Sequence, residues 1–168
     1  MGGALAGAVA AGVWAAQQPL DKRLFGCDYD DVEMLGKLAT RSDGWPAAGL
    51  ALHVANGAAF GAGYSLLRPF IPGPPLAAAV TASMVEHLAL WPLGGVVDRH
   101  HPASSDFHDL KGNARAFAQA TWRHLIFGLV LGELERRFNP VDEFEPPGEV
   151  PVSSNGHGNI EQAAVGAA

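Results

Sequence analysis

The chain has 168 residues, of which 48% are hydrophobic and 17% are charged, and its formal net charge is −6. An acidic chain without a basic cluster lacks the electrostatic surface that nucleic-acid binding requires. Its one cysteine, Cys27, excludes an intramolecular disulfide and a zinc site made of several cysteines. The mean hydropathy of +0.10 is typical of a soluble protein, so the distribution of the charged residues is the informative quantity.

Four apolar segments contain only three charged residues, namely Glu86, Arg123 and Glu133. These segments cover residues 3–20, 47–67, 76–97 and 116–134. A helix needs about 20 mostly apolar residues to cross the hydrocarbon core of a bilayer, and the second and third segments meet this length. The first segment is rich in alanine and glycine, so it has to continue to about residue 22 in order to span. Because the first basic residue, Lys22, follows this run, we expect a retained helix rather than a cleaved signal peptide.

The main alternative to a membrane protein is a soluble helical bundle. Such a bundle requires a polar face on each helix that recurs every 3.6 residues. The second segment shows no such face between residues 49 and 67. The sequence therefore predicts an all-α fold over residues 1–137, in which four transmembrane helices form a bundle and the lipid bilayer is the partner.

The lysine and arginine residues favour one orientation in the membrane. The connectors after the first and third segments carry seven of them, whereas the opposite side has three, Arg68, Arg136 and Arg137. Since basic residues concentrate on the cytoplasmic side, both of these connectors are predicted to be cytoplasmic. A bacterial inner membrane is the natural setting for such a protein.

The parts of the chain outside the four segments differ from one another. Residues 30–40 place three apolar residues on one helix face and pair Glu33 with Lys37 at i,i+4 spacing. This pattern predicts a short amphipathic helix at the membrane interface, and a solvated turn of helix fits it as well. Residues 138–168 are acidic and rich in proline, glycine and serine, a composition that predicts a disordered tail.

The second and fourth segments carry the same pattern, H-x-x-x-G-x-x-x-G. It is formed by His53, Gly57 and Gly61 and again by His124, Gly128 and Gly132. Each copy follows an apolar segment that ends in a proline and a short charged exit, so we expect a tandem duplication of a helical hairpin. Glycines at this spacing share one helix face and let another backbone approach closely, which makes these four predicted packing positions. Such faces, where they are exposed, also allow a homodimer.

Ionisable residues inside a bilayer are costly and usually face the interior of a helix bundle. In the predicted topology several of them fall at a similar depth, in the cytoplasmic half of their helices. This polar layer consists of His53, Glu86, His87, Arg123 and His124. Glu86 and Arg123 carry opposite charges, and we expect them to form an ion pair.

Three interpretations of the polar layer remain open. It can hold the helices together, because hydrogen bonds between spanning helices are common. It can carry or sense protons or a small solute, since histidine titrates near neutrality and Glu86 can exchange a proton with it. It can also hold a haem or a metal ion, with His53 and His124 as opposed ligands. Movement or sensing of protons or a small solute is the leading hypothesis.

A second polar cluster precedes the fourth segment. It contains His100, His101, Asp106 and His108, which are candidate ligands for a divalent metal ion. Such a run is more often a solvated loop, and its spacing matches no established ligand pattern. The sequence lacks a phosphate-binding loop, a nucleophile elbow, H-E-x-x-H and a dinucleotide fingerprint, so no enzymatic activity is indicated.

The general pattern resembles a family of small bacterial inner-membrane proteins. The two-helix halves, the Glu86-His87 pair and the motif from His124 to Gly132 followed by Glu135-Arg136-Arg137 are similar to the YagU-type group. The resemblance covers residues 3–137. It implies an integral membrane protein without assigned chemistry, and it transfers no catalytic residue.

Overall fold

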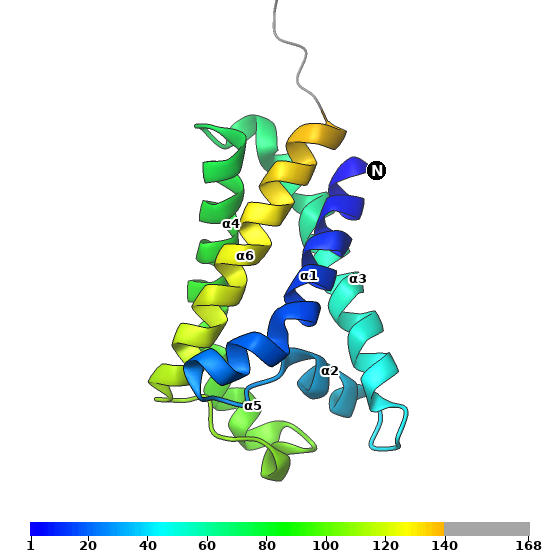
Figure 1. Ribbon diagram of the computed structural model, residues 1–168, viewed down its shortest axis with the longest axis vertical. Coiled ribbons are helices and arrows are strands. Elements are labelled where there is room, and N and C mark those ends of the chain that lie inside the picture. Colours follow the sequence, from blue (N-terminus) through cyan, green and yellow to red (C-terminus); the bar gives the residue numbers. More distant parts are fainter. Residues whose placement is uncertain (140–168) are drawn as a thin grey trace, which may run out of the picture.

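The computed structural model describes residues 1–139, and the regular structure in this part of the chain is all helical. The long helices run side by side (Figure 1); they are α1 (Gly2–Phe25), α3 (Trp45–Leu67), α4 (Pro75–Leu90) and α6 (Ala114–Phe138). The short helices α2 (Asp31–Ala39) and α5 (Gly94–His100) both lie at one end of the long ones (Figure 1). The all-α prediction is therefore confirmed. The predicted tail lies outside the described residues, apart from its first two positions.

The order of elements is the same in the two halves of the chain. Each half consists of a long helix, a short helix and a second long helix, first as α1, α2 and α3 and then as α4, α5 and α6. Both short helices lie at the end of the molecule opposite the N-terminus (Figure 1). This arrangement corresponds to the expected pair of tandem hairpins, with a short helix inside each long connector.

Glycines bring the helix backbones of each hairpin into direct contact. A Cβ atom on Gly7 would lie 2.0 Å from the carbonyl oxygen of Gly57. One on Gly61 would lie 2.2 Å from the carbonyl oxygen of Gly3. In the second hairpin, a Cβ atom on Gly128 would lie 2.7 Å from the Cα atom of a residue on α4. Because the obstructing atoms belong to the backbone, these crossings require glycine.

The predicted packing glycines therefore lie inside the molecule. Gly57 and Gly61 face α1, and Gly128 and Gly132 face α4. Because each pair is already covered by a helix of its own hairpin, neither presents the exposed glycine face on which a homodimer was expected to form.

Helix α2 is amphipathic and packs directly on α3. The carboxylate of Asp30 caps its first turn by accepting a hydrogen bond from the Glu33 amide at 2.9 Å, and the Glu33–Lys37 ion pair forms at 2.7 Å. Its close approach to α3 again depends on glycine, because a Cβ atom on Gly36 would lie 2.1 Å from the Trp45 carbonyl oxygen. The predicted helix thus forms, and it packs against the first turns of α3.

The long helices form an open arc rather than a closed bundle. Helix α1 packs against α3 and α6, and α6 packs against α4, whereas α3 and α4 have almost no direct contact. At the end near the N-terminus the arc is held together by the Tyr64 hydroxyl, which donates to the Pro75 carbonyl at 3.1 Å. Below this contact, the seam between α3 and α4 remains open.

Small and polar residues make up much of the interior, and many large apolar residues face outward. Asp21, Gln119 and Arg123 are fully buried. The apolar part of the core is rich in alanine, namely Ala6, Ala10, Ala11, Ala78 and Ala79. Leucines are exposed on every long helix, for example Leu5, Leu50, Leu88 and Leu129. Soluble bundles bury such leucines and expose their charges, so this distribution is reversed.

By length and hydropathy, one described helical segment qualifies as a membrane span, and it covers Pro75–His100. This segment bends where α4 passes into α5, at the 3-10 turn Trp91–Leu93. The other three predicted spans do not meet the same criterion. The reason lies in composition. Glycines and polar residues such as Gln17 in α1 and His53 in α3 lower the mean hydropathy of these helices, and α6 contains several charged and polar residues.

Candidate functional site

Arg123 lies in the interface between α1 and α6 and has no exposed side-chain surface. Its Nε and Nη2 atoms donate to the two carboxylate oxygens of Asp21 at 2.6 and 2.7 Å. Its Nη1 atom donates to Asp31 at 2.7 Å, and Nη2 also donates to the Tyr29 carbonyl at 2.9 Å. All three guanidinium nitrogens are thus occupied, which compensates for burial of the charge.

The ion pair expected between Glu86 and Arg123 does not form, and this prediction was wrong. Glu86 instead contacts the neighbouring residue, His124, whose Nε2 atom lies 2.9 Å from the Glu86 carboxylate. Successive residues on a helix point about 100° apart, so Arg123 faces α1 while His124 faces α4. The true partner, Asp21, directly follows the first apolar segment.

Asp21 is saturated with hydrogen bonds. Besides Arg123, its carboxylate accepts from the side-chain amides of Gln17 and Gln119, each at 2.6 Å. A buried carboxylate with a bidentate guanidinium and two amide donors is a stable arrangement with no free acceptor for a ligand. This part of the polar layer therefore joins helices rather than forming an open site.

Asp31 connects the buried ion pair with the histidines. Its carboxylate accepts hydrogen bonds from the Tyr29 hydroxyl and from Nε1 of Trp14, in addition to Arg123. Burial raises the pKa of Asp31, but the positive charge of Arg123 and the Tyr29 hydrogen bond outweigh it, so the pKa lies below its ordinary value. Burial and the Asp31 charge raise the pKa of Tyr29. Asp31 is therefore ionised at neutral pH, and Tyr29 is a neutral donor.

The three histidines of the predicted polar layer lie close together around Trp14, and two of them contact its indole ring. The Trp14 ring makes edge contacts with His53 and His124, with centroid distances of 5.3 and 4.7 Å. The His87 ring lies 4.6 Å from that of His124. Each long helix contributes one of these four rings, so only the tertiary structure brings them together.

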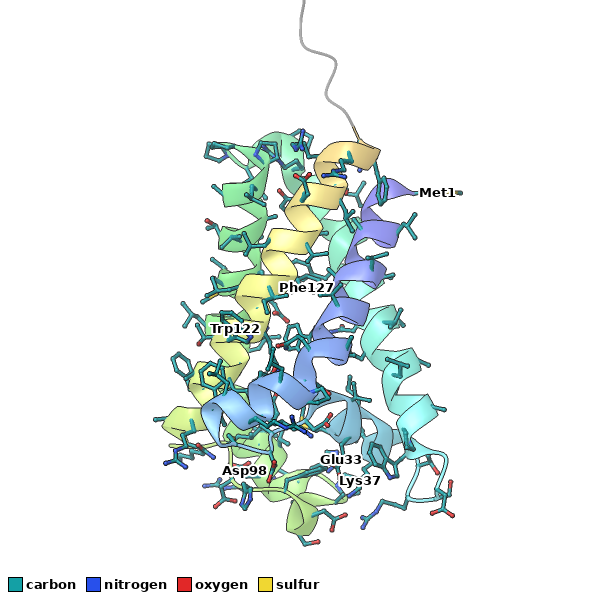
Figure 2. The ribbon with its side chains drawn as sticks, in the orientation of Figure 1. Met1, Glu33, Lys37, Asp98, Trp122 and Phe127 are labelled. Atoms are coloured by element: carbon teal, nitrogen blue, oxygen red, sulfur yellow. The ribbon has the colours of Figure 1, made fainter. Side chains whose placement is uncertain are left out.

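A cleft of about 260 Å³ lies beside these rings, where the seam between α3 and α4 is open. Its ionisable lining residues are Asp31, His53, Glu86, His87 and His124. Aromatic side chains form much of the remaining wall, namely Trp14, Tyr29, Phe60, Trp91 and Phe127, the last of which lies at mid-height of the molecule (Figure 2). Of the predicted polar layer, four residues line the cleft and Arg123 does not.

Glu86 and His124 share one proton. The Nδ1 atom of His124 lies 2.7 Å from the Ala120 carbonyl, which can only accept, so Nδ1 carries a hydrogen. The 2.9 Å contact between Nε2 and the Glu86 carboxylate then requires a second hydrogen, on one of these two atoms. In either form the pair is neutral as a whole, and it holds a proton that faces the cleft.

His87 is positioned to accept a proton. Its Nε2 atom lies 3.0 Å from the hydroxyl of Thr121, and that hydroxyl donates its own hydrogen to the Phe117 carbonyl at 2.8 Å. The His87 Nε2 atom must therefore be the donor, which leaves the lone pair of neutral His87 on Nδ1. The His87 ring lies beside that of His124, and both residues line the cleft.

His53 has an unused ring nitrogen. The side chain is only 7% exposed, yet its Nε2 atom has no hydrogen-bond partner in the described residues. A buried polar atom without a partner costs about 1–3 kcal/mol, so its retention suggests a role that the protein alone does not fulfil.

The haem interpretation requires an available ring nitrogen on both His53 and His124. Both nitrogens of His124 are already hydrogen-bonded, and the indole of Trp14 contacts both imidazoles. Among residues 1–139, no group of three or more histidine, cysteine, aspartate or glutamate side chains is arranged to hold a metal ion. The arrangement of donors thus favours a hydrogen-bonded ligand over a coordinated metal.

The second polar cluster positions a loop against α2. His101 is buried; its Nε2 atom contacts the Met34 carbonyl at 3.0 Å, and its Nδ1 atom accepts from the Ala103 amide at 3.1 Å. Asp106 pairs with Lys37 at 2.9 Å, at the end of the molecule where α2 lies (Figure 2). His100 and His108 are exposed. The four candidate ligands therefore do not face a common point.

No protein-family model, curated protein or solved structure matches this chain. The similarity to the YagU-type family accordingly stays a prediction, and the chemistry of the site rests on its own residues.

Proposed function

We propose that this chain is an integral membrane protein that binds a small solute in the cleft between α3 and α4. In this proposal Glu86 and His124 hold a proton that is exchanged when the solute binds, and His87 takes part in the exchange. Arg123 and Asp21 keep the two hairpins together and do not contact the solute.

The reversed distribution of side chains supports the membrane location. Leucines on all four long helices face outward, whereas the fully buried positions include an arginine and an aspartate. In a membrane, lipid surrounds the outward leucines, and the buried arginine and aspartate are kept away from the lipid by the surrounding helices. The excess of lysine and arginine at the end with α2 and α5 favours a cytoplasmic location for these helices, in a bacterial inner membrane.

The observation that carries the functional part is the position of His53. His53, whose buried Nε2 atom has no partner among the described residues, lines the same cleft as Glu86 and His124. The other titratable groups around this pair are His87 of α4 and Asp31 of α2. A polar ligand that completes the hydrogen bonding of His53 therefore binds beside a group that can gain or lose a proton.

The membrane location is tested by washing membranes from expressing cells with alkaline carbonate. An integral protein stays in the membrane pellet, and release of the folded chain into the supernatant would contradict the proposal. Photolabelling from a lipid-soluble probe gives a second readout, with labels expected on the outward leucines of α1 and α4.

Proton binding is tested by fluorescence of Trp14, whose ring touches two of the histidines. The protein is placed in lipid nanodiscs, and the fluorescence of Trp14 is obtained by comparison with Trp14→Phe. This fluorescence is expected to change with pH because an imidazolium quenches a neighbouring indole. Glu86→Gln and His124→Gln should alter this transition, and Glu133→Gln, at an exposed carboxylate of α6, should leave it unchanged. A wild-type signal independent of pH would show that the cleft holds no exchangeable proton.

A further inference from the structure

The buried charges beside the cleft do not balance. Asp21 and Asp31 supply two negative charges, and Arg123 supplies one positive charge to both. The nearest lysine of this region, Lys22, pairs with Asp30 at 2.6 Å and so does not neutralise Asp31. Since the Glu86–His124 pair is neutral, one negative charge remains at the inner end of the cleft, where Asp31 is part of the lining. A bound cation would compensate it.

The wall of the cleft suits an organic cation. Five aromatic side chains line it, and the faces of Trp, Tyr and Phe rings attract ammonium groups, most strongly where water is excluded. A small hydrated metal ion would lose its water here without gaining enough oxygen ligands, because the carboxylate of Asp31 is already occupied by three donors.

His53 and Glu86 offer acceptors to such a ligand. Neutral His53 has one ring nitrogen with a lone pair, and the partnerless Nε2 atom can accept from an N–H group. The Glu86 carboxylate contacts His124 through Oε2, so its other oxygen, Oε1, is available as an acceptor. The Glu86 side chain is 30% exposed and lines the cleft. An ammonium with at least one N–H can donate a hydrogen bond to these acceptors, whereas a quaternary ammonium has no N–H to donate.

Part of the cleft wall is apolar, with Leu35, Leu90, Leu93 and Val97 among its lining residues. The seam between α3 and α4 is not closed by direct helix contact. In a membrane the part of this seam between α3 and α4, beside the exposed Leu90 and Leu93, faces lipid. A ligand with an apolar chain can thus approach from the bilayer.

We infer that the cleft binds a lipophilic amine in its ammonium form, whose N–H donates to Nε2 of His53 and whose chain lies along Leu90 and Leu93. The inference rests on the proposed function and adds the chemical class of the solute. Its charge complements Asp31, its N–H supplies the partner that His53 lacks, and its chain fills the lateral opening.

Calorimetry on the full chain in lipid nanodiscs tests this, with empty nanodiscs subtracted. The probes are octylamine, octanol and octanoate, which share one chain and differ in charge, together with octyltrimethylammonium, which has the charge without an N–H. We expect octylamine to bind about tenfold more tightly than octanol, octanoate to bind weakest, and octyltrimethylammonium to bind less tightly than octylamine.

Two substitutions test the named residues. His53→Phe keeps an aromatic ring against Trp14 but removes the accepting Nε2 atom. Glu86→Gln replaces the carboxyl group of the second acceptor with an amide. Each should lower octylamine affinity about tenfold. In His53→Phe the affinity for octyltrimethylammonium, which has no N–H to donate, should stay constant, and Glu133→Gln should leave the affinity for every probe unchanged. Equal affinity of the wild type for amine and alcohol overturns the inference without depending on any variant.

The two proposals fail in different ways. Retention of the pH-dependent Trp14 signal without a preference for octylamine would reject the amine as ligand and leave the proton-binding cleft in place. Loss of both the pH response and all probe binding would reject the proposed function itself.

Discussion

Asp21 and Arg123 form a bidentate ion pair in which neither side chain has any exposed surface. The two residues belong to different hairpins, because Asp21 lies on α1 and Arg123 on α6. This pair closes the seam between α1 and α6, whereas the corresponding seam between α3 and α4 has little contact and contains the cleft. The two seams of the repeat thus differ in structure: a buried ion pair holds one of them, and the other contains the cleft.

Loss of the buried ion pair should destabilise the protein strongly. Arg123→Gln leaves the Asp21 charge buried without its main partner, which costs about 3–5 kcal/mol. Asp21→Asn should have a comparable effect, and the double variant should lose less than the sum of the two because the partners interact directly. Denaturation in mild detergent, followed by circular dichroism, measures all three. Glu133→Gln, whose ion pairs are exposed, serves as the control and should unfold like the wild type.

Two glycines on α1 should respond in opposite ways to the same substitution. Gly7→Ala places a methyl group against the Gly57 backbone and should cost about 1–3 kcal/mol, since neither helix backbone can move aside locally. Gly12 has open space around it, so Gly12→Ala should be neutral or gain up to about 1 kcal/mol in helix propensity. Thermal unfolding of both variants decides this, and equal stability would show that α1 and α3 do not cross at Gly7.

Stability should decline in acid because of Asp31. The folded-state pKa of this carboxyl lies below its ordinary value of about 3.9, so its contribution is fully present above that pH and is lost as the pH falls toward the folded pKa. Asp31→Asn should be less stable than the wild type at neutral pH, and the difference should shrink below about pH 4. Urea unfolding at a series of pH values measures the difference. A constant gap between wild type and variant down to the lowest pH would contradict the assignment.

His101 should show a single tautomer with the hydrogen on Nε2. The Met34 carbonyl only accepts, and the Ala103 amide only donates, so the two contacts determine which ring nitrogen carries the hydrogen. Nitrogen chemical shifts of ¹⁵N-labelled histidine, assigned with His101→Gln, report this directly at neutral pH. A mixture of tautomers would indicate that the loop before α6 is not held against α2 as described.

Much of the local structure could be predicted from the residues alone. The spacing of Gly57 and Gly61, and of Gly128 and Gly132, identified the helix faces that pack, because a glycine stripe has few other uses in a helix. The amphipathic pattern around Glu33 and Lys37 predicted α2, since its periodicity and its cap are both encoded within a few neighbouring residues. The same local signals placed His53, His87 and His124 at a similar depth.

The pairing of charges, by contrast, depended on the rotation of each helix about its own axis. Arg123 and His124 are adjacent in sequence, yet one contacts Asp21 and the other contacts Glu86, and a small rotation of α6 would exchange their roles. Asp21 and Asp31 lie outside the apolar segments, so hydropathy gave no reason to place them with the buried residues.

The order of residues was therefore sufficient for the helices, their hairpin repeat and their glycine contacts, because those features arise from interactions between near neighbours or from composition. Contacts across the two hairpins decided the remainder: the Asp21–Arg123 pair, the open seam between α3 and α4, and the unpartnered nitrogen of His53. These depend on which helices pack in three dimensions and in what orientation, and a linear pattern of polar and apolar residues does not contain that information.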